Sequence, residues 1–383
     1  MIRNSITPSA PRSPLRRALG QVDWIMVAVT IALSAFGVLM IYSAIHSNPE
    51  LLASGLHWKQ ALWSSIGLAL LGFILLFDYH HLTRMAYFLY ALVLILLLLV
   101  LFTGRVVYGA KRWLVFGPFR FQPSELAKLA VIIVFARYFS ARENTEPLRL
   151  SELFLPLLFV LVPVFLVAKQ PDLGTAFTIL LIGATMVFCV GVERRVGIFL
   201  GATALTLAPL AWLFLKDYQR GRILTLFNPE ADPLGAGYQS LQSKIAVGSG
   251  ELWGKGLLQG TQSRLHFLPE KHTDFIFSVL SEELGFVGGT ILLVIFLIFI
   301  HRCMVTALSA GDKEGTLIAT GVAASFFLYT VFNIGMTLGL IPIVGIPLPL
   351  VSYGGSASLA SFIAAGLVIS VRLRRKSFAP FSP

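Results

Sequence analysis

Acidic side chains open three of the apolar stretches in this sequence. Asp274 and Asp172 each stand at the start of an apolar run, and Glu125 stands two residues after a proline at the start of a third. Ionisable side chains in apolar segments are costly, so they mark either a functional position or a fixed ion pair. The three carboxylates are therefore the first candidates for chemistry.

Asp274 has the most basic surroundings of the three. Four basic side chains precede it in the sequence: Arg264, His266, Lys271 and His272. A carboxylate among cations suits an anionic, lipid-borne substrate, and it can take a proton from a sugar hydroxyl as that hydroxyl attacks. The same cations predict a lowered pKa for Asp274, which weakens it as a base. The structural alternative is an ordinary aspartate at a helix start, with Thr273 as the cap.

The other two carboxylates also have a structural explanation beside a functional one. Glu125 and Lys128 are three residues apart on a predicted helix, where they form either an ion pair or part of a site. Asp172 at a helix start is stabilised by about 0.3–1 kcal/mol by the helix dipole alone. A functional role for Asp172 requires it to face the same cavity as Lys128.

Glu282 and Glu283 lie deeper in the segment that Asp274 opens. On one helix they are rotated by roughly 80° and 180° from Asp274, so the three acids do not share one site. At least one of the glutamates is expected to pair with a neighbouring helix.

Composition assigns the chain to the polytopic membrane proteins. Its 383 residues are 56% hydrophobic and only 13% charged, and the mean hydropathy is +0.80. A soluble protein of this length cannot bury so much apolar surface. The apolar runs predict an all-α fold with about ten transmembrane helices, centred near Ala32, Leu68, Leu94, Ile132, Val160, Ile182, Thr206, Leu292, Leu328 and Ala364.

The distribution of basic residues predicts that both termini are cytoplasmic. Sixteen Lys and Arg fall on the side of the termini, against six in the short loops on the other side: Lys59, Arg105, Lys111, Arg112, Arg120 and Lys169. This bias accounts for the net charge of +11 without nucleic acid. We expect a disordered tail at 1–20, a transmembrane domain at 21–372 whose first run is an uncleaved span, and a second tail at 373–383.

Three segments between the apolar runs are unusual. Residues 103–121 form a basic, aromatic, glycine-rich outer loop, and residues 216–272 form a long outer loop that we expect to be ordered. Within 333–359, prolines and glycines prevent an unbroken helix, so the backbone must line a cavity or be buried there. Asn333, Ser352 and Ser356 are the residues expected to supply hydrogen bonds in that segment.

Several function classes lack support. No nucleotide-binding, GxSxG, metalloprotease or dinucleotide motif is present in the sequence. Cys189 and Cys303 are far apart and offer neither a disulfide framework nor a zinc site. ATP-driven transport, hydrolase and metalloprotease chemistry are therefore not indicated.

Five blocks of the sequence resemble one family, the SEDS proteins of bacterial shape, elongation, division and sporulation. The blocks are "FQPSELAKL", "KQPDLGTA", "GAGYQSLQSKIAVGSG", "GTQSRLHFLPEKHTDFIFSVLSEELGF" and "LPLVSYGGSA", and they occur in the family's order from the first span to the last. The segment "GLIPIVGIPLPLVSYGGSA" is more similar to the elongation branch than to the division branch. Glu251 departs from the pattern, because the family commonly has a glycine there.

The resemblance implies a ten-helix glycosyltransferase of the bacterial cytoplasmic membrane. It would polymerise the peptidoglycan precursor lipid II on the outer, periplasmic face during cell elongation and so maintain rod shape. By this analogy Asp274 is the catalytic base for the acceptor hydroxyl, and undecaprenyl pyrophosphate is the leaving group. Substrate-binding roles are implied for six residues: Arg112, Trp113, Glu125, Lys128, Asp172 and Lys244.

Other properties follow from the resemblance or stay open beside it. The expected partners are lipid II, a class B penicillin-binding protein acting as transpeptidase, and other membrane proteins of the elongation complex. No cofactor is certain, although Asp172 and Glu125 are able to hold a divalent cation. Two alternatives remain: a lipid II flippase, which requires polar groups along the whole crossing path, and a non-catalytic scaffold of the wall-synthesis complex.

Overall fold

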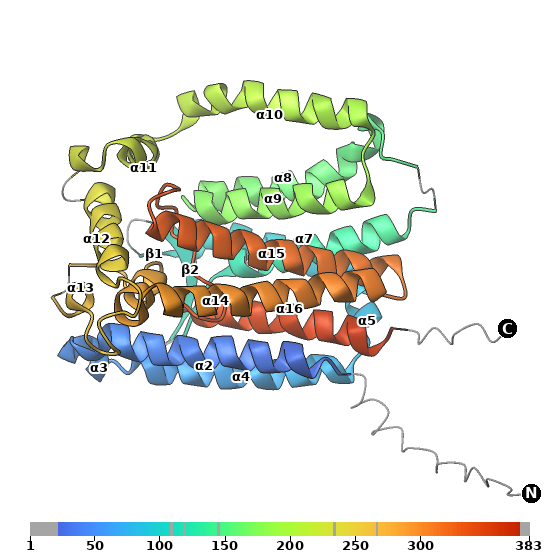
Figure 1. Ribbon diagram of the computed structural model, residues 1–383. Coiled ribbons are helices and arrows are strands. Elements are labelled where there is room, and N and C mark those ends of the chain that lie inside the picture. The colour runs from blue at the N-terminus through green and yellow to red at the C-terminus, as the bar shows by residue number, and fades with distance from the viewer. Residues whose placement is uncertain are drawn as a thin grey trace, which may run out of the picture.

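The computed structural model describes residues 22–107, 110–117, 119–143, 146–232, 235–265 and 267–375. Long helices run side by side in a bundle, with α10 along one edge (Figure 1). Ten helices correspond to the expected centres: α2 (Trp24–His46), α4 (Leu56–Leu76), α6 (Ala86–Thr103), α7 (Pro123–Ser140), α8 (Phe154–Lys169), α9 (Leu173–Val190), α10 (Arg194–Phe214), α14 (Ile276–Ser309), α15 (Lys313–Thr337) and α16 (Gly355–Leu373). The expected polytopic helical fold is confirmed.

Eight helical segments of the described chain are long and apolar enough to cross a membrane. Helices α7 and α10 are not among them. Helix α7 carries Glu125, Lys128 and Arg137 and is buried along most of its length, so neighbouring helices rather than lipid surround its charges. Helix α10 begins with two arginines and contains Pro209. All ten expected helices are therefore present, but composition alone identifies eight of them as spans.

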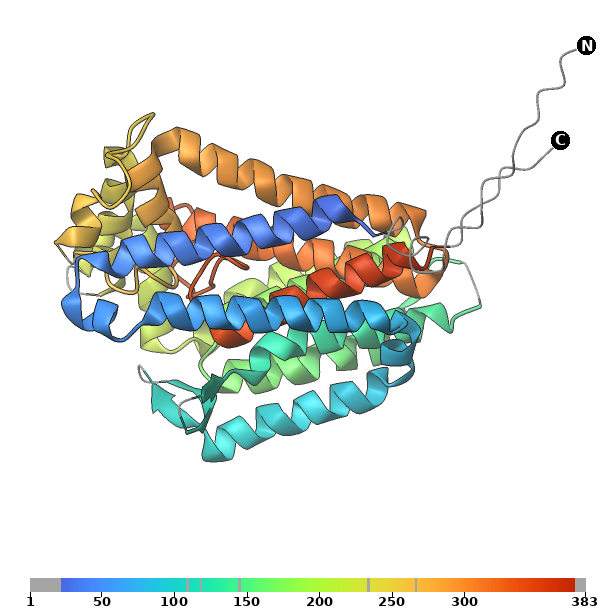
Figure 2. The same cartoon turned by 90° about the horizontal axis from the view of Figure 1, so that it is seen from below.

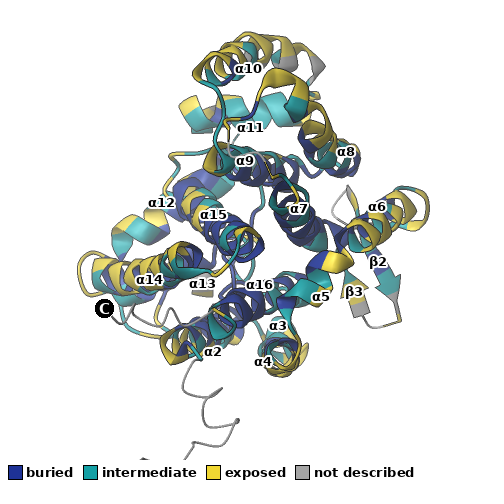
Figure 3. Ribbon diagram, turned by 90° about the vertical axis from the view of Figure 1, so that its right-hand side faces the viewer, coloured by how far each residue is buried: buried dark blue, intermediate teal, exposed yellow. Residues whose placement is uncertain are grey.

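The core of the bundle is formed by α7, α15 and α16, while α4, α6, α8 and α10 turn exposed apolar surface outward (Figure 3). Small residues let the helices approach closely. Gly321 of α15 faces Ile132 of α7, and Gly37 of α2 faces the backbone of Val351, where a β-carbon would collide with its neighbours. This arrangement suits a protein whose outer surface meets lipid and whose polar groups lie inside.

The basic outer loop folds as a small sheet, which the sequence analysis did not predict. Strands β1 (Arg105–Val107), β2 (Ala110–Phe116) and β3 (Phe119–Phe121) pair antiparallel in the order β1-β2-β3. Successive residues of a strand point to opposite faces, so β2 presents Arg112 and Trp113 on different sides. The sheet leads directly into α7, which Pro123 opens at its first turn, as expected.

The long outer segment is ordered, as expected. It contains α11 (Asp217–Phe227), the 3₁₀ turn η2 (Pro229–Ala231), α12 (Ala236–Ser249) and α13 (Thr261–Arg264), which gather at one end of the bundle (Figure 1). Helix α12 packs on the bundle through Ser243, whose hydroxyl donates to the Thr337 carbonyl at 2.7 Å. His266 lies outside the described residues.

Glu282 and Glu283 fasten this segment to the bundle. The hydroxyl of Ser43 on α2 donates to both carboxylate oxygens of Glu283, at 2.7 and 2.5 Å. Glu282 accepts from Lys255 at 2.8 Å and from Thr261 at 2.9 Å. The expectation that at least one glutamate pairs with a neighbouring helix is confirmed. Glu251, which follows α12 in the long outer segment, adopts a φ of 48°, in the left-handed region that favours glycine.

The first and last described residues lie at the same end of the bundle, opposite the long outer segment (Figure 2). Asp23, just before α2, lies 3.3 Å from Arg372 in the last turn of α16.

The remaining helices are short: α3 (Pro49–Ala53), α5 (Tyr79–Arg84) and the 3₁₀ turn η1 (Leu150–Leu153). The expected tail at 1–20 lies outside the described residues, as does all of the second tail beyond residue 375. The side of the membrane on which this end lies stays a prediction.

Candidate active site

Asp274 lies in a turn that precedes α14 rather than in the helix itself. Helix α14 begins at Ile276, with Phe275 as its N-cap. The hydroxyl of Thr273 donates to the Glu270 carbonyl at 3.1 Å, so the expectation that Thr273 caps the helix is wrong. Within the turn, the N–H groups of Thr273 and Phe275 both donate to the Glu270 carbonyl. Asp274 therefore precedes the regular hydrogen bonds of α14.

Three successive backbone carbonyls hold this turn in place against α15 and the segment that follows it. In residues 272–274, the first carbonyl accepts from the Tyr353 N–H at 2.9 Å, the second from the Ser352 hydroxyl at 2.6 Å and the third from the Asn333 amide at 2.9 Å. Asn333 also donates to the Ile346 carbonyl at 2.7 Å. The expected non-helical backbone and the expected hydrogen bonds of Asn333 and Ser352 are confirmed.

Ser356, the third residue expected to form hydrogen bonds, links the same region to α7. Its hydroxyl accepts from the Gln122 N–H at 3.0 Å, directly before the α7 N-terminus. The turn that carries Asp274, the segment between α15 and α16 and the start of α7 therefore form one connected frame.

The Asp274 carboxylate itself has no hydrogen-bond partner among the described residues, and it keeps a partly accessible surface. Burial, and to a lesser extent the nearby Glu270 charge, raise its pKa to about 6, although Arg112 and Arg222 oppose the rise. The sequence-based expectation of a lowered pKa is wrong. Desolvation outweighs the cations, and Lys271 lies near Glu283 instead.

Arg112 and Asp172 meet beside this turn. Arg112 Nη1 lies 3.7 Å from Asp172 Oδ1, and Arg112 Nη2 donates to the Pro171 carbonyl. Asp172 is the N-cap of α9, where its carboxylate accepts from the Thr175 N–H at 3.4 Å. Its other oxygen accepts from Gln122 Nε2 at 3.2 Å. Asp172 therefore both caps α9 and lies beside the Arg112 guanidinium.

Arg222 is a member of the site that the sequence analysis missed. It lies on α11, and its Nη1 donates to the Ile343 carbonyl at 3.2 Å. Its charge is close enough to Asp274 to lower the pKa of that carboxyl. Only its occurrence in an ordered basic loop could have pointed to Arg222, because α11 and the Asp274 turn are distant in sequence.

Glu125 and Lys128 form a buried pair deeper in the bundle. Lys128 Nζ donates to Glu125 Oε2 at 2.8 Å, and the ammonium sits 3.9 Å from the centre of the Tyr329 ring. Both side chains are almost fully inaccessible. The ion pair expected from their spacing is confirmed, and it is an electrostatic neighbour of Asp172 rather than a wall of an open cavity.

A cavity of about 420 Å³ adjoins Arg112 and Arg222, which both line it. Its walls come from α8, α9, α11, α15 and the segment before α16, and they are mainly apolar, with Leu173, Phe177, Ile223, Phe332 and Val344 among the lining residues. A cavity with a mainly apolar wall and two guanidinium groups in its lining matches an amphiphile that carries phosphate.

Two residues with expected substrate-binding roles do not join this group. Lys244 lies on α12 with its side chain against Gly339, and it is not among the residues that line the cavity. Trp113 points to the face of β2 opposite Arg112. The structure thus brings together Arg112, Asp172 and Asp274, with the Glu125 and Lys128 pair behind them.

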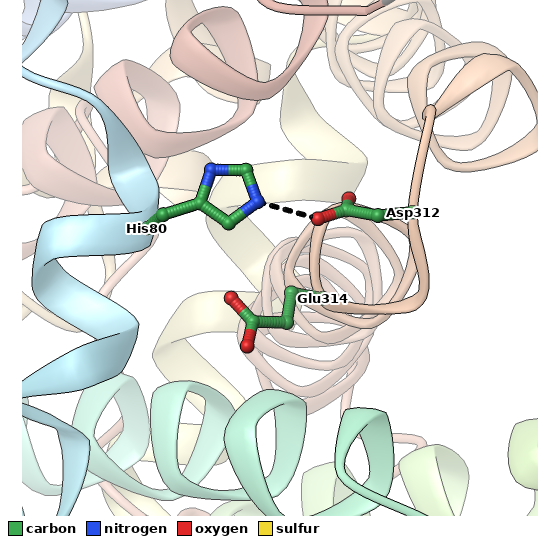
Figure 4. A group of neighbouring side chains, drawn as sticks. All are labelled: His80, Asp312 and Glu314. Atoms are coloured by element: carbon green, nitrogen blue, oxygen red, sulfur yellow. Dashed lines mark hydrogen bonds and ion pairs between the residues drawn. The ribbon is translucent and has the colours of Figure 1, made fainter. Parts of the chain in front are cut away.

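A second ionic cluster lies at the opposite end of the bundle, where His80, Asp312 and Glu314 come together (Figure 4). His80 Nε2 lies 2.7 Å from Asp312, which joins α14 to α15. The remaining polar atoms of the three residues bind other protein groups, from Asp78, Tyr79, Thr83, Arg137 and Ser140. One imidazole and two carboxylates are a ligand set that metals use, but here the protein itself satisfies those ligand atoms.

The fold and the site define a multi-pass membrane protein with an ionic site beside an apolar cavity at one end of its helix bundle. Residues 23–377 match the model of the family that joins FtsW, RodA and SpoVE, described as cell cycle proteins. The chain belongs to this family, which confirms the resemblance found in the sequence.

Curated relatives and solved structures agree with this assignment. The chain is 42% identical to the peptidoglycan glycosyltransferase MrdB of Escherichia coli K12, over 93% of this chain and 94% of the relative. It is 33% identical to the peptidoglycan glycosyltransferase RodA of Treponema pallidum, over 94% and 99%. Among solved structures, RodA of Thermus thermophilus matches with a TM-score of 0.69 at 31% identity, over 93% of this chain and 98% of that one.

A second solved structure concerns an assembly. It was described as the structural coordination of polymerization and crosslinking by a peptidoglycan synthase complex. One of its chains matches with a TM-score of 0.79 at 34% identity, over 92% of this chain and 98% of that one. The shared architecture therefore extends over nearly the whole chain.

Proposed function

We propose that this protein polymerises lipid II into glycan strands, with Asp274 as the general base, on the outer face of the cytoplasmic membrane. The class is given by the family and its relatives: the chain is a peptidoglycan glycosyltransferase. The observation that carries the assignment of Asp274 is its unpaired carboxylate, held by a fixed turn, with Arg112 and Arg222 nearby and an apolar cavity beside them.

In the proposed reaction, Asp274 takes the proton of the acceptor's GlcNAc 4-hydroxyl as its oxygen attacks the anomeric carbon of the donor. The new glycosidic bond forms while the bond from that carbon to the pyrophosphate oxygen breaks. The electron pair leaves with undecaprenyl pyrophosphate, and the proton stays on Asp274. A pKa of about 6 places this base nearer the operating pH than an ordinary aspartate, so proton transfer is more favourable.

Arg112 and Arg222 are the groups that we assign to the leaving pyrophosphate. Both line the cavity, and fixed cations facing a site where negative charge develops lower the barrier without reorganising. A pyrophosphate leaves without being protonated, so one carboxylate is sufficient, unlike the two that glycosidases use. Asp172 positions Arg112 in this scheme, and the apolar wall of the cavity receives the beginning of the lipid chain.

The polar groups are distributed in a way that favours transfer over transport. A flippase needs polar groups along the whole crossing path, whereas the Asp274 site and the His80 cluster lie at opposite ends of the bundle, with the apolar side chains of α7 between them. The basic residues predict that the Asp274 end faces the periplasm. We assign the chain to cell elongation, where it would act together with a class B penicillin-binding protein. The structurally similar synthase complex, which was described as coordinating polymerization and crosslinking, supports this partner.

The proposal is tested by incubating the purified chain, with its transpeptidase partner, with fluorescent lipid II and an inhibitor of conventional glycosyltransferases. Wild type is expected to make polymer, and Asp274→Asn is expected to make at least about 100-fold less. Glu230→Gln is the matched control, because it removes an exposed carboxylate from the same outer segment. Polymer from the folded Asp274→Asn variant at a rate close to that of wild type would refute the assigned base, and no polymer from folded, partner-bound wild type would favour the flippase or scaffold.

A further inference from the structure

A second pocket lies at the end of the bundle opposite Asp274, where three helices meet. Its volume is about 310 Å³, and it is lined by Val22, Asp23, Trp24, Ile25, Arg302, Arg372 and Arg375. These residues come from the start of α2, the second half of α14 and the end of α16 with the residues just after it. None of them takes part in the proposed glycosyl transfer, so the pocket needs an explanation of its own.

The one carboxylate of the pocket is already occupied. Asp23 Oδ2 accepts from Arg302 Nε at 2.9 Å and from Arg302 Nη2 at 2.8 Å, and its Oδ1 accepts from the Met26 N–H at 3.3 Å as the helix cap. The Asp23 side chain is only 1% exposed. One negative charge is therefore shared between Arg302 and Arg372, and the three arginines that line the pocket exceed it by two positive charges.

Arg372 and Arg375 carry that excess positive charge. Arg372 Nη1 lies 3.3 Å from Asp23 Oδ2 but makes no hydrogen bond, and the atom is buried. Arg375 is exposed and has no ion-pair partner within the residues that the structure describes. The N-terminus of α2 adds partial positive charge at the same place. The pocket therefore offers the exposed guanidinium of Arg375 and a positive potential to an anion with several acceptor oxygens, which is the chemistry of a phosphate group.

The rim of the pocket indicates what the phosphate is attached to. Trp24 and Ile25 line the pocket and are 58% and 53% exposed. The outer face of α14 continues from the pocket with exposed apolar side chains, among them Leu297 and Met304. Tryptophan beside a row of exposed apolar residues is typical of the membrane interface. An anion bound here sits where the polar end of the helix bundle meets a surface that suits acyl chains.

We propose that this pocket binds the headgroup phosphate of an anionic phospholipid, whose acyl chains lie along the outer faces of α2 and α14. Basic pockets between membrane helices are known to take such headgroups. A bound lipid would place negative charge between the ends of α14 and α16, and so relieve the repulsion between Arg302, Arg372 and Arg375. The site is separate from the proposed active site and does not depend on it.

The proposal is tested by native mass spectrometry of the full chain in detergent, with phosphatidylglycerol and phosphatidylcholine added in equal amounts. Wild type is expected to retain phosphatidylglycerol selectively. Arg375→Gln is expected to weaken that binding about five-fold, since one basic residue near an anionic lipid contributes about 1 kcal/mol. The matched control is Arg195→Gln, which removes an exposed arginine from α10 at the same end of the bundle but outside the pocket.

Equal weakening in the two variants would overturn the proposal, because it would indicate diffuse attraction to the basic surface. Displacement of the lipid by an excess of inorganic phosphate would also overturn it, in favour of a small-anion site. A photoactivatable phosphatidylglycerol provides a test that needs no variant. Its label is expected on wild-type peptides that contain residues 22–25, Arg302 or 372–375, and label confined to other peptides would contradict the proposed pocket.

Discussion

The two ends of the bundle treat their carboxylates in opposite ways. At one end, Asp274 has no hydrogen-bond partner among the described residues, and its pKa is raised to about 6. At the other end, Asp312 and Glu314 lie beside His80 (Figure 4). Their carboxylates accept hydrogen bonds from tyrosine, threonine, serine and arginine side chains. The same type of side chain is left unsatisfied where chemistry is proposed and is satisfied where it holds helices together.

This difference implies opposite contributions to stability. Asp274 binds its proton more tightly in the folded state than the ordinary value of 3.8, so its contribution to the free energy of unfolding falls as pH rises from about 4 to about 6. At neutral pH the charged Asp274 costs up to about 3 kcal/mol. The cluster at the His80 end stabilises the fold instead. Stability is therefore given up at the proposed active site and supplied at the other end.

The largest expected effect comes from Asp274→Asn. The amide cannot take the proton of the acceptor, so the rate of lipid II polymerisation is expected to fall by about 10²–10⁴. The same change removes a buried charge, so thermal unfolding should occur at a higher temperature than in wild type. Loss of both activity and stability would show that Asp274 holds the fold, and would remove the contrast between the two ends.

The next effect is expected from Glu314→Gln at the His80 end. Glu314 is buried and pairs with Arg137 at 3.0 Å, so loss of its charge should lower the free energy of unfolding by about 2 kcal/mol. Polymerisation per folded molecule should be unchanged. The exposed Glu143→Gln serves as the control in the same thermal unfolding assay. A fall in activity per folded molecule would mean that the two ends are coupled.

A smaller effect is expected on the pH dependence of the polymerisation rate. Only the carboxylate form of Asp274 accepts a proton, so the rate should rise with pH through about pH 6. Arg222→Gln removes a charge that lowers the pKa of Asp274 and should move this rise to higher pH. Glu270→Gln removes a charge that raises the pKa and should move it to lower pH. Shifts in the same direction, or none, would refute Asp274 as the titrating group.

The smallest effect is expected from His80→Gln. Burial lowers the pKa of His80, but hydrogen bonds to Asp78 and Asp312 outweigh it and raise the pKa above its ordinary 6.5. The stabilisation is then fully present below pH 6.5 and is lost as pH rises through the folded pKa. Wild type should therefore lose more stability than His80→Gln as pH rises above 6.5. The same dependence of stability on pH in both proteins would show that the His80 imidazole does not carry a charge in this pH range.

Local patterns allowed much of the fold to be predicted. The ten apolar runs gave the ten helices, and the spacing of Glu125 and Lys128 gave their ion pair. Prolines and glycines gave the non-helical segment, together with the hydrogen bonds of Asn333 and Ser352. These features depend on residues close in sequence or on the general cost of unsatisfied backbone in a membrane.

The site was less predictable, because its properties depend on tertiary placement. The charge of Arg222 acts on Asp274 only because the fold brings α11 near the Asp274 turn. The pKa of Asp274 rises because burial outweighs the nearby cations. The sheet at β1 to β3 was missed because the loop was interpreted through its charge rather than its alternation. Lys244 and Trp113 carry the family's pattern, but the structure places them outside the group around Asp274.

The turn that carries Asp274 is held by three of its own consecutive carbonyls, each of which accepts a hydrogen bond from a residue at 333 or at 352–353. These two parts of the chain are distant in sequence, and the three hydrogen bonds fix one against the other. In a chimaera of two family members, the two segments should therefore be transferred together. A chimaera that imports residues 268–275 alone would receive the reactive acid without the frame that aims it, whereas one that also imports 333–353 would receive both.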